Sequence, residues 1–400
     1  MTRRNARKLA SFAGSVLALV ATTQSAHADW DLSTGLEHRY FPRDRTALNA
    51  VDNATSVVAL LKGYQSYGPD SGLTLELFGR HSFDDSSRSH RDVRELWFHR
   101  GDHSLEIGIG VTQEFWGVTE SHHLVNVLNQ VDVLEDLDGE DYLGQPMVKI
   151  LKRFGSSSLG AYVLPYFRPR EFHDAGERLG TPFEVLNQQY ESGAEEWHTD
   201  YAVRWFAQME YLDLGVAYFS GTDREPVMTA LDAGITPIYH QIEQVTMDAQ
   251  VTVDRWLFKA ELLRKTGYGA PIFAYVAGFE YTWYQLTQQQ ADVGLVVEHL
   301  YDDRPDLGTP QSVFDDDWFI GARLTLNNTA DTNLLVGVYL DRERSERIFR
   351  MEFSHRITDG WSLDLQATTF RSRESGTPIY LVRHDDFISL TLTAHIGIRR

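Results

Sequence analysis

The feature that most constrains this chain is an alternation of apolar and polar side chains with a period of two residues. From Ile388 to Ile398 every even-numbered residue is apolar, and every odd-numbered residue between them is polar or small. A period of two places these two sets of side chains on opposite faces of a β-strand. Similar runs occur at 104–112, 245–254, 273–281 and 318–327. The sequence therefore predicts an all-β fold.

The runs are about ten residues long, which is the length that a tilted β-strand needs to cross a bilayer. No window reaches the roughly 18 to 20 consecutive apolar residues of a membrane-spanning helix. We predict a transmembrane antiparallel β-barrel of about 18 strands, with 16 as the alternative. The candidate strands are 30–41, 53–65, 72–83, 92–100, 104–115, 146–154, 158–167, 200–208, 212–220, 240–253, 256–266, 272–284, 291–301, 317–327, 332–341, 346–356, 361–372 and 385–398.

The connections between these strands alternate in length. Tight links at 100–103, 155–157, 209–211, 254–255, 328–331 and 357–360 are separated by longer ones at 116–145, 168–199, 221–239, 302–316 and 373–384. Outer-membrane barrels have short periplasmic turns and long extracellular loops. The alternation therefore favours a barrel over a soluble β-sandwich.

Aromatic residues near the predicted strand ends are typical of the girdles at the two membrane interfaces. We expect this role for Trp30, Tyr40, Phe41, Phe115, Trp116, Tyr166, Phe167, Tyr281, Trp283, Trp318, Trp361 and Phe387.

Composition excludes several function classes. The chain has no cysteine, which rules out disulfides, thiolate catalysis and cysteine-ligated zinc. Its 37 Lys and Arg residues against 57 Asp and Glu residues give a net charge of −20. An acidic chain gains nothing from counterion release on a polyanion, so we expect no nucleic-acid partner.

The first 28 residues have the pattern of a secretory signal. Arg3, Arg4, Arg7 and Lys8 precede an apolar stretch from Leu9 to Ala21, and Ala26-His27-Ala28 is an A-x-A cleavage site. We predict a signal peptide at 1–28 and a single barrel domain at 29–400.

Four short stretches carry a resemblance to known proteins: 115–121 (FWGVTES), 129–132 (NQVD), 138–141 (DGED) and 143–146 (LGQP). They are similar to a segment in outer-membrane proteins of unassigned transport role. Over its mature length the chain resembles, in pattern, porin-like outer-membrane β-barrels of Gram-negative bacteria. The resemblance implies an outer-membrane location, with membrane lipids, lipopolysaccharide and the barrel-assembly machinery as partners. The chain departs from the family in ending Ile398-Arg399-Arg400, because such barrels usually end in an aromatic residue that the assembly machinery reads.

Residues that face the interior of a barrel determine its selectivity. Link 116–145 is too long for a simple hairpin, and we expect it to fold into the lumen as a constriction. Other inward positions include Arg80, Glu298 and Asp364. We predict pore-lining or constriction roles for Glu106, Glu114, Asp132, Glu135, Asp136, Asp138, Asp248, Lys259, Glu261, Arg323, Arg350 and Glu352.

The apolar spacing between Leu124 and Leu137 is compatible with a short helix in this link. Its carboxylates make calcium a weak alternative to a negatively charged pore lip. With Gly139 at position 6 of an EF-hand loop, Asp136 and Asp138 fit, but Leu134 and Gln145 occupy positions 1 and 12. We therefore expect no cofactor or metal.

Sequence motifs of hydrolases, metalloproteases and nucleotide-binding enzymes are missing, and we expect no catalytic site. The favoured function is passive diffusion of small polar solutes or ions through the barrel, with a mild preference for cations. A non-conducting outer-membrane protein for binding or adhesion is the alternative, and a soluble periplasmic all-β protein is the third.

Overall fold

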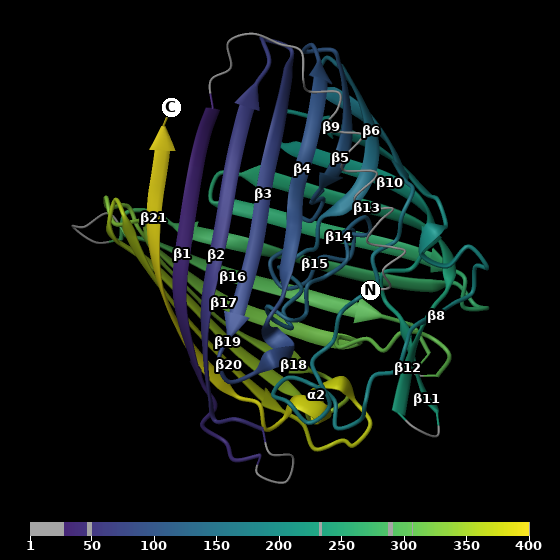
Figure 1. The fold of residues 1–400 in the computed structure, drawn as a ribbon, viewed down its shortest axis with the longest axis vertical. Coiled ribbons are helices and arrows are strands. Elements are labelled where there is room, and N and C mark those ends of the chain that lie inside the picture. Colours follow the sequence, from purple (N-terminus) through teal and green to yellow (C-terminus); the bar gives the residue numbers. More distant parts are fainter. Residues whose placement is uncertain (1–27, 46–49, 232–233, 287–290, 306, 400) are drawn as a thin grey trace.

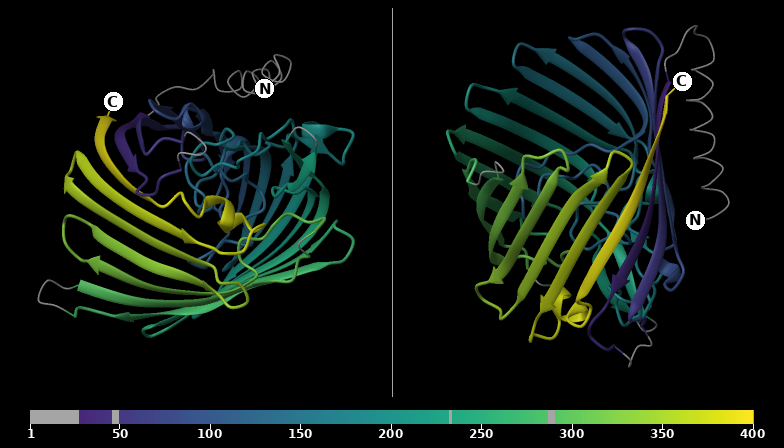
Figure 2. Two further views of the ribbon diagram at one scale, coloured as in Figure 1. Left: turned by 90° about the horizontal axis from the view of Figure 1, so that it is seen from below. Right: turned by 90° about the vertical axis from the view of Figure 1, so that its left-hand side faces the viewer.

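Eighteen antiparallel strands form one closed sheet around a filled interior (Figure 1, Figure 2). The computed structural model describes residues 28–45, 50–231, 234–286, 291–305 and 307–399. Apart from Ala28, the predicted signal peptide at 1–28 lies outside the described residues and stays a prediction.

All 18 predicted strands are present, so the count of 18 is confirmed over the alternative of 16. The barrel strands are β1 (Ala28–Tyr40), β2 (Asn53–Ser66), β3 (Ser71–Ser82), β4 (Arg91–Gly101), β5 (Leu105–Thr112), β6 (Gln145–Phe154), β7 (Ser157–Leu164), β9 (Asp200–Gln208), β10 (Leu212–Thr222), β13 (Gln241–Val253), β14 (Trp256–Thr266), β15 (Ile272–Trp283), β16 (Ala291–Asp302), β17 (Asp316–Leu326), β18 (Thr332–Asp341), β19 (Arg347–Thr358), β20 (Trp361–Arg371) and β21 (Phe387–Arg399).

The first and last strands close the barrel. Strand β1 pairs with β2 on one side and with β21 on the other, in a register that sets Trp30 opposite Ile398 and Tyr40 opposite Ile388. A closed sheet leaves no strand edge unpaired, which is why a barrel can cross a membrane that an open sheet cannot.

The period of two sorts side chains between the two faces as the sequence predicts. Ile107 and Leu390 point outward and are 48% and 45% exposed. Asp248 and Glu261, at inward positions of β13 and β14, are buried. The outer face is therefore apolar and suits contact with lipid, and the inner face carries the charges.

The aromatic girdle is only partly as predicted. Trp283, Trp318 and Trp361 are exposed on the outer face. Five predicted girdle residues are instead buried: Phe41, Trp116, Tyr166, Phe167 and Phe387. Strand alternation explains the contrast between Tyr40, which is exposed, and its neighbour Phe41, which faces the interior.

The connections alternate between short and long, as predicted, and the long ones gather at one end of the barrel. They contain the 3-10 helices η2 (Ser86–Arg88) and η3 (Glu195–Trp197), the helix α2 (Pro378–Val382), and a small separate sheet of β8 (Gln189–Tyr190), β11 (Val227–Leu231) and β12 (Gly234–Tyr239). Figure 1 shows α2 and the small sheet at the same end. No helix among the described residues is long and apolar enough to cross a membrane.

Strand β5 ends earlier than predicted, so the link between β5 and β6 spans 113–144. The hydrogen-bond ladder of β5 ends because backbone N–H groups bind asparagine side chains in place of a neighbouring strand. Glu114 N–H donates to Asn129 Oδ1 at 2.9 Å, and Trp116 N–H donates to Asn126 Oδ1 at 2.6 Å. The prediction of a short helix in this link is wrong, since 113–144 contains turns and one isolated bridge, between Val131 and Tyr142, but no helix.

Candidate functional site

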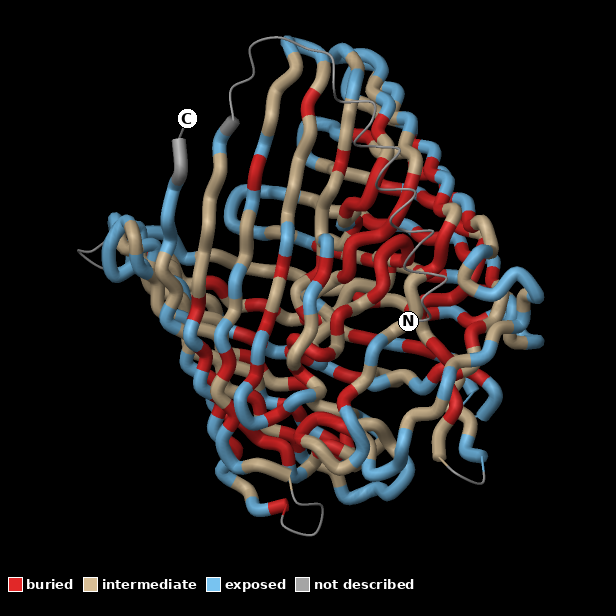
Figure 3. Tube along the Cα trace, in the orientation of Figure 1, coloured by how far each residue is buried: buried red, intermediate tan, exposed pale blue. Residues whose placement is uncertain are grey.

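The link 113–144, here called the interior segment, lies inside the barrel. Its residues contact strands around the wall: Thr119 binds Glu261 on β14, Ser121 binds Glu298 on β16, and Asp138 binds Arg350 on β19. Figure 3 shows buried chain crossing the space between the strands. The candidate site is therefore a lumen partly occupied by this segment.

Two wall carboxylates hold the start of the interior segment. Glu261 accepts hydrogen bonds from the N–H groups of Val118 and Thr119 at 2.7 and 3.0 Å, and from Val125 N–H at 3.2 Å. Its side chain is fully buried. A carboxylate has about four lone-pair positions, so Glu261 can replace the backbone partners that an irregular segment lacks.

Glu298 acts in the same way from β16. It accepts from the N–H groups of Glu120 and Ser121 and from the Ser121 hydroxyl, at 2.6 to 3.1 Å. Sequence reasoning placed Glu261 and Glu298 inside the barrel, but it could not show that they bind backbone N–H groups rather than line open water. Their partners are more than 130 residues away in sequence.

His123 adds a positive charge beside Glu261. Its Nε2 lies 3.2 Å from Glu140 and its Nδ1 lies 3.7 Å from Glu261. Burial would lower the pKa of His123, but the two carboxylates outweigh burial and raise that pKa to about 10. The imidazole is therefore charged at neutral pH and joins the start and the end of the interior segment to the wall.

The predicted constriction carboxylates Asp132, Glu135 and Asp136 are buried and engaged by side chains of the wall. Glu135 accepts two hydrogen bonds from Arg80, both at 2.6 Å. Asp132 lies 3.1 Å from His90 Nε2, and Asp136 accepts from the Gln366 amide at 2.6 Å. These groups fasten the segment to β3, the link after it, and β20.

Asp138 is the fourth carboxylate of this group and lies against the cavity described next. It accepts a hydrogen bond from Arg350 at 2.5 Å. Burial and the nearby charge of Asp136 nevertheless outweigh Arg350 and raise the pKa of Asp138 to about 8. This carboxyl therefore loses its proton at a higher pH than an ordinary aspartate does.

A cavity of about 800 Å³ lies between the interior segment and the wall. It reaches Asn333, Ser354 and Asp364, which lie near the ends of β18, β19 and β20 beside the short connections. Its carboxylates outnumber its Lys and Arg residues. The acidic lining residues are Glu37, Glu120, Asp138, Glu140, Glu352 and Asp364, and the basic ones are Lys259, Arg323, Arg350 and the charged His123.

The charged residues that line this cavity differ in how they are paired. Arg323 pairs with Glu120 at 2.5 Å, and Lys259 lies 3.7 Å from the same carboxylate. Glu352 pairs with Arg350. Asp364 has no ion pair or side-chain hydrogen bond with any residue in the described ranges, and it is exposed in the lumen. His395 interacts with it only electrostatically, so its carboxylate is open to a solute.

The remaining predicted residues lie inside the barrel but away from this cavity. Asp248 binds Arg204 at 2.6 and 2.9 Å, and the Arg204 guanidinium lies 5.0 Å from the ring centre of Trp116. Glu114 pairs with Lys149 at 2.5 Å, and Glu106 pairs with Arg153 at 2.9 Å. The fold thus separates the twelve predicted residues into cavity-lining, segment-holding and peripheral groups.

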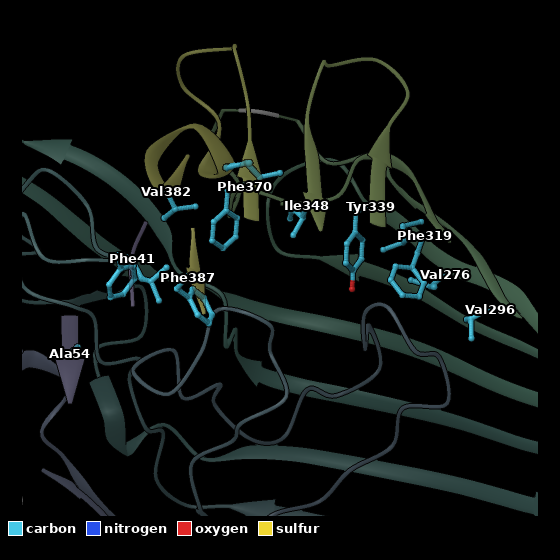
Figure 4. Close-up of a cluster of buried hydrophobic side chains, with 13 residues drawn as sticks. Phe41, Ala54, Val276, Val296, Phe319, Tyr339, Ile348, Phe370, Val382 and Phe387 are labelled. Atoms are coloured by element: carbon cyan, nitrogen blue, oxygen red, sulfur yellow. The ribbon is translucent and has the colours of Figure 1, made fainter. Parts of the chain in front are cut away.

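Two apolar clusters pack against the interior segment. In Figure 4, Phe319, Tyr339, Ile348 and Phe370 project from β17 to β20 into the barrel. They belong to one cluster with Leu179 and α2 residues, and Leu124 of the segment packs against it. A second cluster surrounds Val125, Val127 and Leu128 of the segment and includes wall residues such as Trp97, Met147 and Phe219.

The packing narrows the half of the lumen next to the long connections, because the ends of β18, β19 and β20 that carry Tyr339, Ile348 and Phe370 lie there. Sequence patterning missed this interior layer, since an inward aromatic residue has the same period as an inward polar one. The signal available was the apolar run in 124–137.

Among the described residues, one group of carboxylates near the long connections has a spacing that could suit a cation: Asp315, Asp317 and Asp341. Asp315 also pairs with Arg344 at 2.8 Å. The carboxylates of the interior segment named in the calcium alternative are engaged by protein side chains: Asp136 by Gln366 and Asp138 by Arg350.

Comparison with known proteins supports the fold. No protein-family model matches the chain, and no curated protein matches it. Among solved structures, it is similar to a BenF-like porin from Pseudomonas fluorescens Pf-5, at 9% identity and a TM-score of 0.55, over 94% of this chain and 100% of the porin. Pseudomonas aeruginosa OccK2 (OpdF), solved in complex with glucuronate, matches at 11% identity and a TM-score of 0.53, over 94% and 99%.

The chain is similar to the same degree to Wzi of Escherichia coli, a carbohydrate-binding β-barrel of the outer membrane involved in group 1 capsule assembly. The identity is 9% and the TM-score 0.55, over 98% of this chain and 91% of Wzi. The fold is therefore that of porin-like outer-membrane barrels, as the resemblance implied.

Proposed function

We propose that this protein is an outer-membrane channel for the passive diffusion of small polar solutes or ions, with a mild preference for cations. The observation that carries the proposal is the cavity of about 800 Å³ inside the closed barrel, lined by more carboxylates than Lys and Arg side chains. In a narrow passage of low dielectric, excess carboxylates raise the local concentration of cations. The porin neighbours support the channel class.

In this proposal the long connections face the cell exterior, the barrel contacts outer-membrane lipid and lipopolysaccharide, and the barrel-assembly machinery inserts it. No cofactor or metal is involved. The interior segment narrows the lumen, so that a solute passes between the segment and the wall at Glu352 and Asp364.

A second candidate is a barrel that binds a polar ligand without conducting. It is favoured by the two apolar clusters that pack around the interior segment, because such packing can close the half of the lumen beside the long connections. Wzi gives this class a structural neighbour.

Single-channel recording in planar bilayers separates the two candidates. The channel proposal expects discrete conductance steps from the purified wild-type protein, and a larger step when 116–141 is replaced by a short Gly-Ser turn. A silent wild type together with a conducting deletion variant would favour the binding protein. A silent wild type and a silent, correctly folded deletion variant would reject the channel.

A further inference from the structure

Two arginines lie directly opposite one another on the outer face of the barrel. Arg347 begins β19, Arg371 ends β20, and the two are cross-strand partners. Their neighbours Ile348 and Phe370 are buried in the interior, so strand alternation turns both arginines outward. Directly opposite side chains are about 4.5 to 5.5 Å apart at Cβ, and like charges there are destabilising.

The protein neutralises this pair incompletely. Asp386 accepts hydrogen bonds from Arg371 at 2.8 Å, and the same carboxylate pairs with Arg43 at 2.8 Å. Arg347 has no ion pair or side-chain hydrogen bond with any residue that the structure describes. Two arginines therefore share one carboxylate and the third has none, although the protein as a whole carries a net charge of −20.

The nearest carboxylate in sequence does not serve Arg347. Glu346 is 2% exposed and accepts hydrogen bonds from the hydroxyls of Ser372 and Thr377, both at 2.5 Å. An anionic partner for Arg347 would therefore have to come from outside the chain.

Below the arginine pair the outer face becomes apolar within one cross-strand step. The next outward pair is Phe349 and Thr369, followed by Met351 and Ala367. Phe349 is exposed on this face. The surface thus has cationic groups at the rim and an apolar strip toward the middle of the barrel, which is the order of headgroup and acyl chain in a lipid.

We infer that Arg347 and Arg371 bind the phosphate group of an acylated, phosphorylated lipid of the outer leaflet, with an acyl chain along Phe349. A guanidinium is planar and can donate two parallel hydrogen bonds to a phosphate. Basic side chains beside a membrane are favourable for anionic lipid headgroups. The inference rests on the proposed outer-membrane setting with the long connections outward, but it does not depend on conduction.

The test measures lipid binding by the purified full chain in neutral detergent, with native mass spectrometry as the readout. The probe is bis-phosphorylated lipid A, and the reference lipid is the same molecule after removal of both phosphates. We expect the double variant Arg347→Gln/Arg371→Gln to bind lipid A about tenfold more weakly than the wild type, because charge-assisted hydrogen bonds to phosphate are lost. We expect the dephosphorylated lipid to bind the wild type about as weakly.

The matched control is Arg264→Gln. Arg264 is an exposed, outward residue near the same end of β14, opposite Phe273, and it too lacks a side-chain partner in the described ranges. The control should bind lipid A like the wild type. If the double variant folds poorly, Arg347→Lys serves as the second variant. It keeps the charge but loses the planar guanidinium, so it should bind lipid A more weakly than the wild type.

Three results would overturn the inference. Equal binding of lipid A and its dephosphorylated form would mean that the contact is apolar only. An equal loss of lipid A binding in Arg264→Gln would mean that any outward arginine contributes, and that Arg347 and Arg371 do not form a specific site. Displacement of lipid A by equimolar inorganic phosphate would mean that Arg347 and Arg371 bind a soluble anion and not a lipid. A protein that binds lipid A as expected but never conducts would contradict the channel proposal and leave this inference standing.

Discussion

The backbone and the side chain of Thr119 both donate to Oε1 of Glu261, at 3.0 and 2.8 Å, although the two residues are 142 positions apart. A single buried oxygen thus joins the interior segment to the wall of the barrel. Replacing the carboxylate leaves several buried N–H groups without an acceptor, and this gives the first prediction.

Glu261→Ala should loosen the interior segment. Removing one member of a buried, hydrogen-bonded charge network costs about 3 to 5 kcal/mol, so we expect the segment to detach while the barrel persists. The measurement is limited proteolysis at 116–141 together with single-channel conductance, both of which should increase. Glu106→Ala, which removes a half-exposed carboxylate near a short connection, is the control. A protected segment in Glu261→Ala would show that Glu298 and the other wall contacts hold it without Glu261.

Asp364 should contribute to ion preference. Its carboxylate lines the cavity and has no ion pair or side-chain hydrogen bond among the described residues, so Asp364→Asn should reduce the preference for cations over anions without disturbing the interior segment. The reversal potential in a salt gradient measures this, and the effect should be largest at low ionic strength, where screening is weakest. Asp248→Asn, which changes a buried carboxylate bound to Arg204 and away from the cavity, should leave the reversal potential unchanged. An unchanged reversal potential in Asp364→Asn would place the permeation path elsewhere.

Alkaline pH should loosen the interior segment. Burial and Asp136 raise the pKa of Asp138 from 3.8 to about 8, and its carboxylate partners raise the pKa of His123 from 6.5 to about 10. A group whose pKa rises on folding contributes stability that is lost as pH increases through the folded value. Asp138 therefore loses its contribution between about pH 4 and pH 8, and His123 loses its contribution between about pH 6.5 and pH 10.

Conductance and protease access should accordingly increase on titration from pH 6 to pH 10. Asp138→Asn removes the first of these titrations and should leave only the change above neutral pH that belongs to His123. A conductance that falls with rising pH would contradict the conclusion that Asp138 and His123 stabilise the interior segment less as the pH rises.

The two faces of β21 can be tested with adjacent residues. Leu390 is 45% exposed on the outer face and Thr391 lines the cavity. Leu390→Arg sets a charge against lipid, at a cost of about 2 to 4 kcal/mol near the bilayer midplane, and should reduce assembly into the membrane. Thr391→Arg faces water and should assemble normally. Heat-modified migration on electrophoresis reports assembly, and equal tolerance of both variants would mean that the outer face does not meet lipid.

The strands could be predicted because alternation is a local property: β13, β14 and β21 can each be found within about ten residues. The contents of the lumen could not. The sequence predicts that link 116–145 is too long for a hairpin and rich in carboxylates, but Glu135 and Asp132 bind Arg80 and His90, which are 55 and 42 residues away. The number of carboxylates alone predicts a negatively charged pore lip, because it contains no information on ion pairs between residues that are distant in sequence.

The interior aromatic layer was hidden for a related reason. Phe319 and Trp318 are neighbours in sequence and equally aromatic, yet Phe319 is 3% exposed and Trp318 is 40% exposed on the opposite face. Alternation shows which residues share a face, but a polar residue is needed to tell which face points inward. The inward residues at this end of β17 to β20 are largely apolar, so the pattern does not identify them.

The closure of β1 on β21 sets an order of events during biogenesis. In the chain, the interior segment comes before Glu261 of β14 and Glu298 of β16, the two carboxylates that hold it. The pairing of β1 with β21 joins the residues that are most distant in sequence. Contacts that close such long loops form late and slowly. Because two apolar clusters pack the segment against the wall beside the long connections, we expect 113–144 to be in position before the seam forms, so that the last strands close around it.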